Sequence, residues 1–454
     1  MSTTPTITVG ELVARFLEQC GVKAAFGVIS IHNMPILDAF HRRQKIRFVS
    51  ARGEAGACNM ADAYARVSAT LGVCVTSTGT GCGNAAGAMV EAITAGTPLL
   101  HLTGQIESEY LDRDLGYIHE HPAQLAMLQS VGKAAFRIRN PETALATLRE
   151  AARLAFTPPC GPVSIEIPID IQAKLLDLPA DLCPLPVPPV VPAASEVAAL
   201  AERLVHAKRP ILWLGGGARG ATAAVQRFVK MGWSVVTSVQ GRGIVPEDHP
   251  CTLGSYNLQK PAEAFYESCD AMLVVGSRLR SNETLRYKLR LPSRICRIDA
   301  NALAHNRGYA SEYFVQGDAQ LTLDALADAL EGRMAIDPNL AADVKRARTE
   351  AAALVDGTLG NSAASRARTN VLRLSAASGS VRALPSGVAA KRARCVVFAL
   401  RRGRARGLGI GLSARQTLAT GQCLVNRRCS RALAAQGAAA GNTPFRGYRA
   451  MFEA

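Results

Sequence analysis

Residues 49–66 read VSARGEAGACNMADAYAR, and this stretch decides how the first half of the chain is expected to fold. Residues 46–49, which are apolar except for Arg47, predict a short strand, and the Ala-rich residues 56–66 predict a helix soon after it. Glu54 stands between the two, and its neighbours are all small: Gly53, Ala55, Gly56 and Ala57. A short strand that leads quickly into a helix is typical of one unit of an α/β layer fold.

The same alternation continues on both sides of this stretch. In the first part, strands are predicted at 24–28, 46–49, 71–76 and 98–103, with helices at 12–20, 56–66 and up to Ala95. In the second part, strands are predicted at 210–214, 234–238, 271–275 and 295–298, with helices at 195–207 and 321–330. The fold class is therefore α/β, with two doubly wound parallel-sheet domains.

These elements divide the chain into five parts. We expect a first domain over 1–178, a proline-rich linker over 179–194, a Rossmann-like central domain over 195–335, a connecting helix over 336–357 and an Arg/Ala/Gly-rich tail over 358–454. The prolines of the linker exclude both helix and sheet. The tail offers too little apolar surface to offset the entropy of ordering it, so we expect it to be poorly ordered.

The net charge of +16 is confined to the tail. From residue 361 onward the sequence has 17 Arg and Lys and one acid, Glu453, so the preceding 360 residues are electrically balanced. A genuine basic tail would bind nucleic acid or an acidic partner. However, it lacks the interleaved aromatic residues that stack on bases. We favour the alternative, a reading-frame shift in GC-rich coding DNA, and do not expect nucleic acid as a partner.

Composition also bounds the cellular location. The N-terminus has no basic segment followed by an apolar run, and no stretch reaches the roughly 18 to 20 apolar residues of a membrane helix. None of the 12 cysteines forms a Cys-x-x-Cys pair. We therefore expect a cytoplasmic protein with reduced, packed thiols and no membrane partner.

Four further stretches accompany residues 49–66 in a fixed order: STGTGCGN at 77–84, TPLLHLTGQ at 97–105, QGRGIVPEDHPCTL at 240–253 and the later positions 297–300 and 317–318. Together they resemble thiamine-diphosphate-dependent enzymes of the acetolactate synthase and 2-oxo-acid decarboxylase family. The likeness covers roughly residues 5 to 335. One segment departs from it, because GVISIHNMP at 27–35 replaces the Gly-x-Pro-Gly loop that is usual in the family.

The resemblance implies a catalytic role for Glu54. In the family, a glutamate at this place hydrogen-bonds the aminopyrimidine ring of thiamine diphosphate, which helps to remove a proton from the reactive thiazolium carbon. A carboxylate among small apolar neighbours suits that role, because burial favours its protonated form. Without the resemblance, Glu54 would be read as a surface glutamate stabilised by a helix dipole.

The resemblance also implies the other site residues. Cofactor contacts are expected at Ile29, Ser30, Thr80, Asn84 and His119, in addition to Glu54. His32 and His119 are expected near the substrate, where an imidazole can move a proton; the alternative is that they are surface or structural histidines.

Three parts of the family pattern are missing or weak here. Family members hold magnesium, and through it the diphosphate, in a third domain marked by Gly-Asp-Gly and a later Asn-Asn. No such pair is found, so Mg²⁺ ligands are expected in the missing domain and none in this chain. FAD is a candidate second cofactor of the central domain, although GGGARG at 215–220 does not fit the Gly-x-Gly-x-x-Gly fingerprint.

The predicted function is thiamine-diphosphate-dependent decarboxylation of a small 2-oxo acid with carboligation, as in acetolactate synthase. In the family the active site lies between two subunits, so we expect a homodimer, a homotetramer or an assembly with a full-length relative. The chain alone is expected to be weak or inactive. Two alternatives stay open: a simple 2-oxo-acid decarboxylase similar to benzoylformate decarboxylase, and a non-catalytic remnant that only dimerises.

Overall fold

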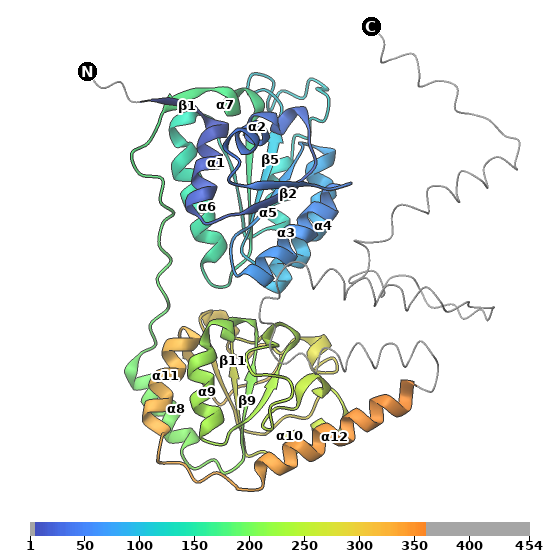
Figure 1. Cartoon of the computed structure of the whole chain (residues 1–454), viewed down its shortest axis with the longest axis vertical. Coiled ribbons are helices and arrows are strands. Elements are labelled where there is room, and N and C mark those ends of the chain that lie inside the picture. Colours follow the sequence, from blue (N-terminus) through green and yellow to red (C-terminus); the bar gives the residue numbers. More distant parts are fainter. Residues whose placement is uncertain (1–4, 360–454) are drawn as a thin grey trace, which may run out of the picture. The chain divides into compact units, whose positions relative to one another are not determined.

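Six parallel strands form the sheet of the first domain in the computed structural model, which describes residues 5–359 (Figure 1). Their order is β3-β2-β4-β5-β7-β6, with bounds β2 (Ala24–Gly27), β3 (Arg47–Ser50), β4 (Gly72–Thr76), β5 (Leu99–Gln105), β6 (Ala134–Arg137) and β7 (Pro162–Pro168). All residues of β4, β5 and β7 are buried. Such continuous burial is typical of central parallel strands covered on both faces.

Helices cover both faces of this sheet. They are α1 (Val9–Gln19), α2 (Met34–Arg43), α3 (Glu54–Ser68), α4 (Thr80–Ala95), α5 (Gln124–Val131), α6 (Ala144–Phe156) and α7 (Ile169–Ala173). Figure 1 shows α1 and α6 on one side of the sheet and α3 and α4 on the other. Two separate hydrophobic clusters agree with this, one built on α1, α2 and α6 and one on α3 and α4.

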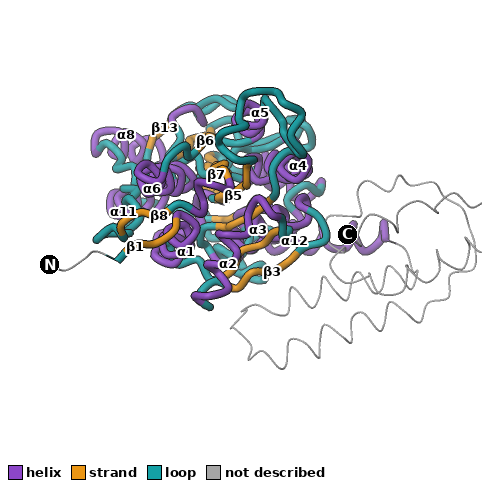
Figure 2. Tube along the Cα trace, turned by 90° about the horizontal axis from the view of Figure 1, so that it is seen from above, coloured by secondary structure: helices purple, strands orange, loops and turns teal. Residues whose placement is uncertain are grey.

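A small antiparallel pair closes the first domain. Strand β1 (Thr6–Thr8) pairs with β8 (Leu175–Asp177), and Figure 2 shows the two strands side by side. The segment after β8 has neither helix nor strand until α8 (Ala194–Leu204) begins. This agrees with the proline-rich linker predicted from the sequence.

The central domain has a five-stranded parallel sheet in the order β10-β9-β11-β12-β13. The strands are β9 (Pro210–Leu214), β10 (Ser234–Thr237), β11 (Ala271–Val275), β12 (Ile295–Asp299) and β13 (Tyr313–Gln316). The helices besides α8 are α9 (Thr222–Lys230), α10 (Lys260–Glu267), α11 (Ala319–Leu330) and α12 (Leu340–Leu359). The prediction of an α/β fold with two doubly wound parallel sheets is thus confirmed.

In both sheets the chain first winds to one side of its first parallel strand and then crosses to the other side, so the winding direction reverses next to that strand. In the first domain this point lies between β2 and β4, and in the central domain between β9 and β11. Doubly wound proteins bind ligands at such a point, beyond the carboxyl ends of the strands. The fold therefore selects two places where a site is expected.

Helix α12 differs from the predicted connecting helix. Its residues Leu340, Val344 and Ala347 are buried in a hydrophobic cluster with Trp213 of β9. Arg209 pairs with Asp337, just before the helix, and with Asp343 within it, the latter over 2.7 Å. The helix is consequently part of the central domain, because its apolar stripe packs on that core.

Several smaller sequence predictions need correction. The helix expected at 56–66 begins at Glu54 itself, which places the carboxylate in the first helical turn. Strands β6, β7 and β13 were not predicted.

Among the described residues, no helix is long and apolar enough to cross a membrane. From residue 360 onward, the predicted tail lies outside the described residues.

Candidate functional site

Four loops meet at the carboxyl edge of the first sheet. They follow β2, β3, β4 and β5, and they carry every site residue predicted from the sequence. Because the strands are parallel, these loops must lie on the same edge.

Glu54 and Asn84 are brought together by two neighbouring helices. Glu54 is the first residue of α3, and Asn84 lies one turn into α4. The Asn84 side-chain amide Nδ2 donates to Glu54 Oε2 over 3.2 Å. The Glu54 side chain is half-buried. Thus the carboxylate does not project freely into solvent, and it lies next to the α4 turn as the resemblance implied.

The turn between β4 and α4 is shaped by glycines. Gly79 has φ +54° and ψ −109°, a conformation open to glycine, and a Cβ there would overlap the carbonyl oxygen of His119. A Cβ at Gly81 would lie 3.1 Å from Glu54 Oε1 and 2.8 Å from the Ser77 Cβ. The two glycines therefore allow the turn to lie tightly against both Glu54 and His119.

The space beside Glu54 is open on another side. A Cβ added at Gly53, Gly56 or Gly83 would meet no atom within 4 Å. Thr80 and Asn84 are both exposed at the start of α4. A flat ring could therefore approach Glu54 from this side, so the residues present fit the pyrimidine of thiamine diphosphate.

His32 and Ser30 lie on the loop after β2. His32 is 2% exposed, and its Nδ1 lies 3.4 Å from the Ser77 hydroxyl. The Ser30 and Ser77 hydroxyl oxygens are 2.7 Å apart. Burial lowers the pKa of His32, nearby His119 lowers it further, and Glu107 partly opposes the shift. His32 is therefore held as a neutral imidazole at neutral pH.

His119 lies on the loop after β5, opposite His32. The two rings make an edge-on contact, with centroids 6.1 Å apart. His119 is exposed, has φ +64°, and its Nδ1 lies 3.4 Å from the Thr80 hydroxyl. Ile29, by contrast, is 62% exposed on its loop. The structure thus brings Glu54, Asn84, Thr80, His119, His32 and Ser30 to one edge; their roles stay predictions.

A buried polar network under the turn was missed by the sequence analysis. Gln124 accepts a hydrogen bond from the Gly79 N–H over 2.6 Å and donates to Glu166 over 2.9 Å. Glu166 in turn pairs with Arg137. One signal was present: Glu166 is the only charged residue in the apolar strand PVSIEIP, and a buried carboxylate needs a partner.

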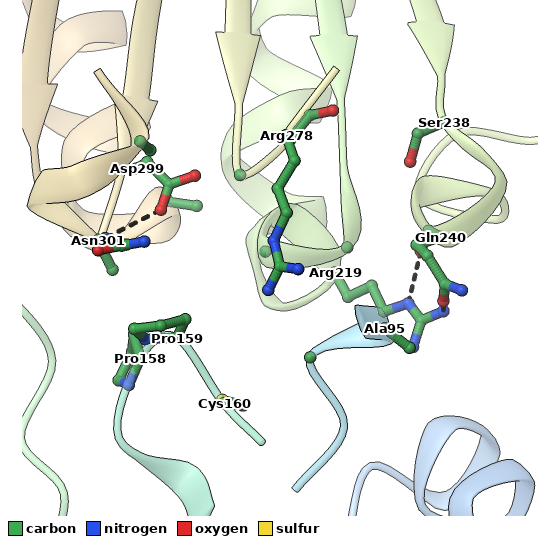
Figure 3. Close-up of a pocket in the computed structure, with 18 of the residues that line it drawn as sticks. Ala95, Pro158, Pro159, Cys160, Arg219, Ser238, Gln240, Arg278, Asp299 and Asn301 are labelled. Atoms are coloured by element: carbon green, nitrogen blue, oxygen red, sulfur yellow. Dashed lines mark hydrogen bonds between the residues drawn. The ribbon is translucent and has the colours of Figure 1, made fainter. Parts of the chain in front are cut away.

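At the second predicted place, the carboxyl edge of the central sheet, lies an arginine-lined cavity of about 410 Å³, which residues of the first domain such as Arg66 and Pro158 also line. Figure 3 shows Arg219, Arg278, Gln240 and Asp299 around it, together with residues 158–160. Arg297, fully buried, also lines the cavity, and its Nε has no hydrogen-bond partner. These arginines fit an anionic ligand.

The glycines of GGGARG have a structural cause in this domain. A Cβ at Gly215 would overlap the carbonyl oxygen of Gly276, and one at Gly217 would lie 2.9 Å from the Gly276 Cα. The Gly217 N–H also donates to the Gly276 carbonyl over 3.0 Å. The triple glycine is thus explained by the close approach of two strand-end loops.

Residues 5–359 contain no cluster of three or more His, Cys, Asp or Glu side chains that would suit a metal ion.

Comparison with known proteins gives matches for both domains. Residues 7–127 match the family described as "Thiamine pyrophosphate enzyme, N-terminal TPP binding domain", and residues 197–326 match "Thiamine pyrophosphate enzyme, central domain".

Three relatives illustrate the likeness. A probable 2-ketoarginine decarboxylase of Pseudomonas aeruginosa is 32% identical over 348 residues, which are 76% of this chain and 62% of that protein. A probable acetolactate synthase large subunit of Methanocaldococcus jannaschii is 29% identical over 336 residues, 70% of this chain and 56% of that one. Acetolactate synthase 1 of Zea mays is 28% identical over 335 residues, 71% and 51% of the two chains. The chain thus spans between half and two thirds of the length of these relatives.

Proposed function

This chain belongs to the thiamine pyrophosphate enzyme family, and on that premise we propose that it supplies the pyrimidine-binding half of an active site for 2-oxo-acid decarboxylation with carboligation. The observation that carries the proposal is the Asn84–Glu54 contact of 3.2 Å beside an open space at the switch point of the sheet. The acetolactate synthases among the relatives favour carboligation as the outcome.

Thiamine diphosphate, when bound, supplies a carbon nucleophile and stabilises negative charge formed as carbon dioxide leaves. Glu54 would hydrogen-bond the pyrimidine through Oε1, since Oε2 already accepts from Asn84. Glu54 is the first residue of α3, so its side chain lies at the same sheet edge as the start of α4. Thr80, at the start of α4, would orient the same ring.

Two histidines would manage protons on the substrate side. His32 is neutral and buried, so it can accept or donate a hydrogen bond without adding charge. His119 is exposed and has φ +64°, which turns it toward the Thr80 hydroxyl. Ser77 and Ser30 hold His32 in place through contacts of 3.4 and 3.5 Å.

The proposal is tested by titrating the full chain with thiamine diphosphate and Mg²⁺ and measuring heat and thermal shift. We expect saturable binding, and we expect Glu54→Gln to weaken it about tenfold to a hundredfold because a charge-assisted hydrogen bond is lost. Glu142→Gln is the matched control, since Glu142 is an exposed glutamate at another helix start of the same domain. Equal affinity of Glu54→Gln and the wild type would refute the role of Glu54.

A second candidate is simple decarboxylation, which ends in protonation of the product carbon. It is favoured by the His32–His119 pair, with rings 6.1 Å apart, and by the decarboxylase among the relatives. Product analysis separates the two: carboligation gives a 2-hydroxy-2-alkyl-3-oxo acid, whereas decarboxylation gives an aldehyde. His119→Gln would lower aldehyde formation and leave carboligation less affected, because only decarboxylation places the added proton on the product carbon, whereas carboligation places it on the oxygen of the acceptor.

Two cofactors complete the proposal. Mg²⁺ would be held by oxygen ligands of a diphosphate-binding domain outside residues 5–359, and it would offset the charge of the diphosphate. FAD is proposed for the central-domain cavity, whose arginines fit its diphosphate. Fluorescence titration with FAD tests this, with Arg278→Met expected to weaken binding and Arg290→Met, on an exposed ion pair, to leave it unchanged.

We further propose that the site edge binds a second subunit, a homologous copy or a full-length relative. The exposed apolar side chains on the two histidine loops support this: Ile29, Ile31, Met34, Leu115 and Ile118. Grouped apolar side chains on a surface are typical of a protein interface. Assembly without cofactor binding would instead favour the non-catalytic remnant.

A further inference from the structure

A continuous chain of buried polar contacts runs beneath the turn that carries Thr80. The Gly79 N–H donates to Gln124 Oε1 over 2.6 Å, and Gln124 Nε2 donates to Glu166 Oε2 over 2.9 Å. Glu166 Oε1 accepts from Arg137 Nε. Gln124 and Glu166 are fully buried, and the Arg137 side chain is 6% exposed. No water is needed to complete these bonds.

The contacts fix the orientation of the Gln124 amide. A backbone N–H only donates, so the atom that faces Gly79 must be the oxygen. The amide nitrogen must then face Glu166, which accepts as a carboxylate. The ionised form of Glu166 is balanced by the Arg137 guanidinium. Gln124 Oε1 also accepts from the Thr78 hydroxyl over 3.0 Å. If the carboxylate were removed, the amide would lose one of its three contacts, and the Gly79 N–H would be held less firmly.

Arg137 also reaches the loop that carries His119. Its Nη1 donates to both carboxylate oxygens of Asp112, over 3.0 and 2.9 Å. This contact lowers the pKa of Asp112. One guanidinium therefore links the buried core strand β7 to the loop after β5.

The turn at the Gly79 end of this hydrogen-bond network is tightly packed on both sides. Gly79 packs against the His119 carbonyl, and Gly81 packs beside Glu54. A shift of the turn would move Thr80 and the start of α4, and with them Asn84. Its effect would therefore reach the Asn84–Glu54 contact.

We propose that Arg137 and Glu166, acting through Gln124, are positioning residues that hold the turn 77–80 and the segment 119–124 in one fixed arrangement. None of the three needs to touch cofactor or substrate. The inference rests on the proposed function only where it concerns cofactor affinity. The fixed arrangement itself does not depend on a bound cofactor and can be measured on the chain alone.

Energetics distinguish positioning from a purely stabilising role. Replacing a buried ion pair by apolar residues of similar size is often neutral for stability. A double substitution Arg137→Met with Glu166→Leu thus leaves the core filled but frees the Gln124 amide. Gln124→Met removes the amide alone and leaves the ion pair intact.

The test measures amide hydrogen exchange of the full chain without cofactor. We expect exchange at Gly79 to be about tenfold faster in both variants, because one hydrogen bond is lost. Exchange in β5 and β7 should stay at the wild-type rate. The matched control is Arg43→Met with Glu18→Leu, a partly buried pair between α1 and α2, which should leave Gly79 unchanged.

Each outcome decides the question. Unchanged exchange at Gly79 in Gln124→Met overturns the proposal, even if the double variant does not fold. Faster exchange throughout β5 and β7 shows a merely structural role and also overturns it. Thiamine diphosphate affinity is then measured; a wild-type chain that binds none contradicts the proposed function but leaves the exchange result standing. Where the wild type binds, both variants should bind about tenfold more weakly.

Discussion

The side-chain amide of Asn84 donates to a carboxylate oxygen of Glu54 over 3.2 Å, across the starts of two adjacent helices. Both helices begin at the carboxyl edge of the sheet, so the positive ends of their dipoles meet there. The second oxygen of Glu54 lies toward Gly81, 3.1 Å from where a Cβ would be. One oxygen is thus engaged within the protein, and the other stays available to a ligand.

Two glycines of the same helix region should respond oppositely to alanine. Gly79 has φ +54°, and a Cβ there would overlap the His119 carbonyl oxygen. We therefore expect Gly79→Ala to lower the free energy of unfolding by about 2 kcal/mol or more. Gly83 lies inside α4, and a Cβ there would meet no atom within 4 Å. We therefore expect Gly83→Ala to raise the free energy of unfolding by about 0.5 to 1 kcal/mol. Calorimetric unfolding measures both. A stable Gly79→Ala would mean that the turn is not packed as described.

We expect buried His101 to make the stability of the first domain decrease at acidic pH. It is fully buried on β5 between the hydroxyls of Thr76 and Ser164, at 2.9 and 3.1 Å. Burial lowers its pKa from 6.5 to about 4. The unfolded chain therefore takes up a proton below pH 6.5, while the folded chain resists until about pH 4. Stability is complete above pH 6.5 and falls between these values, by about 2 to 3 kcal/mol at pH 4.5.

The variant His101→Gln should remove this contribution to the pH dependence. Both tryptophans, Trp213 and Trp233, belong to the central domain, so their fluorescence cannot follow the first domain. Urea unfolding at pH 7 and pH 4.5 is therefore followed by far-UV circular dichroism. His206→Gln, at an exposed position, serves as the control. Equal pH dependence in His101→Gln and the wild type would contradict the prediction.

Helix α12 should stabilise the central domain. Val344 is fully buried in the cluster that contains Trp213. Val344→Ala should cost about 2 kcal/mol through lost burial and the cavity left behind. Tryptophan fluorescence during urea unfolding reports it directly. Lys345→Ala, on the exposed face of the same helix, should change little; equal effects would mean that α12 is not docked.

The two domains and eight of their parallel strands could be predicted, because apolar runs and the glycines that end them are local features of the sequence. The strands at 210–214 and 271–275 agree with β9 and β11 to the residue. Glu54 and Asn84 were both singled out through the family resemblance, because the residues alone would have left Glu54 as a surface glutamate; their direct contact required the fold to bring α3 and α4 together. The Gln124–Glu166–Arg137 network was missed because its bonded pairs are 42 and 29 residues apart along the sequence. Helix α12 was predicted only as a connecting helix, because its short apolar stripe does not reveal that it packs on the central core.

Exposed apolar side chains lie on the loops that carry His32 and His119, and we expect them to belong to a subunit interface. Ile31 and Ile118 are each 66% exposed, and they lie on the loops that hold His32 and His119. If a second subunit covers this edge, a charge there is buried in the complex and opposes assembly. Ile31→Asp with Ile118→Asp should lower the mass measured by light scattering toward that of one chain at micromolar concentration. Val67→Asp is the control, because Val67 is 89% exposed near the far end of α3. If only Val67→Asp lowered the mass, the interface would lie elsewhere on the domain, and the site would have to be completed from another face.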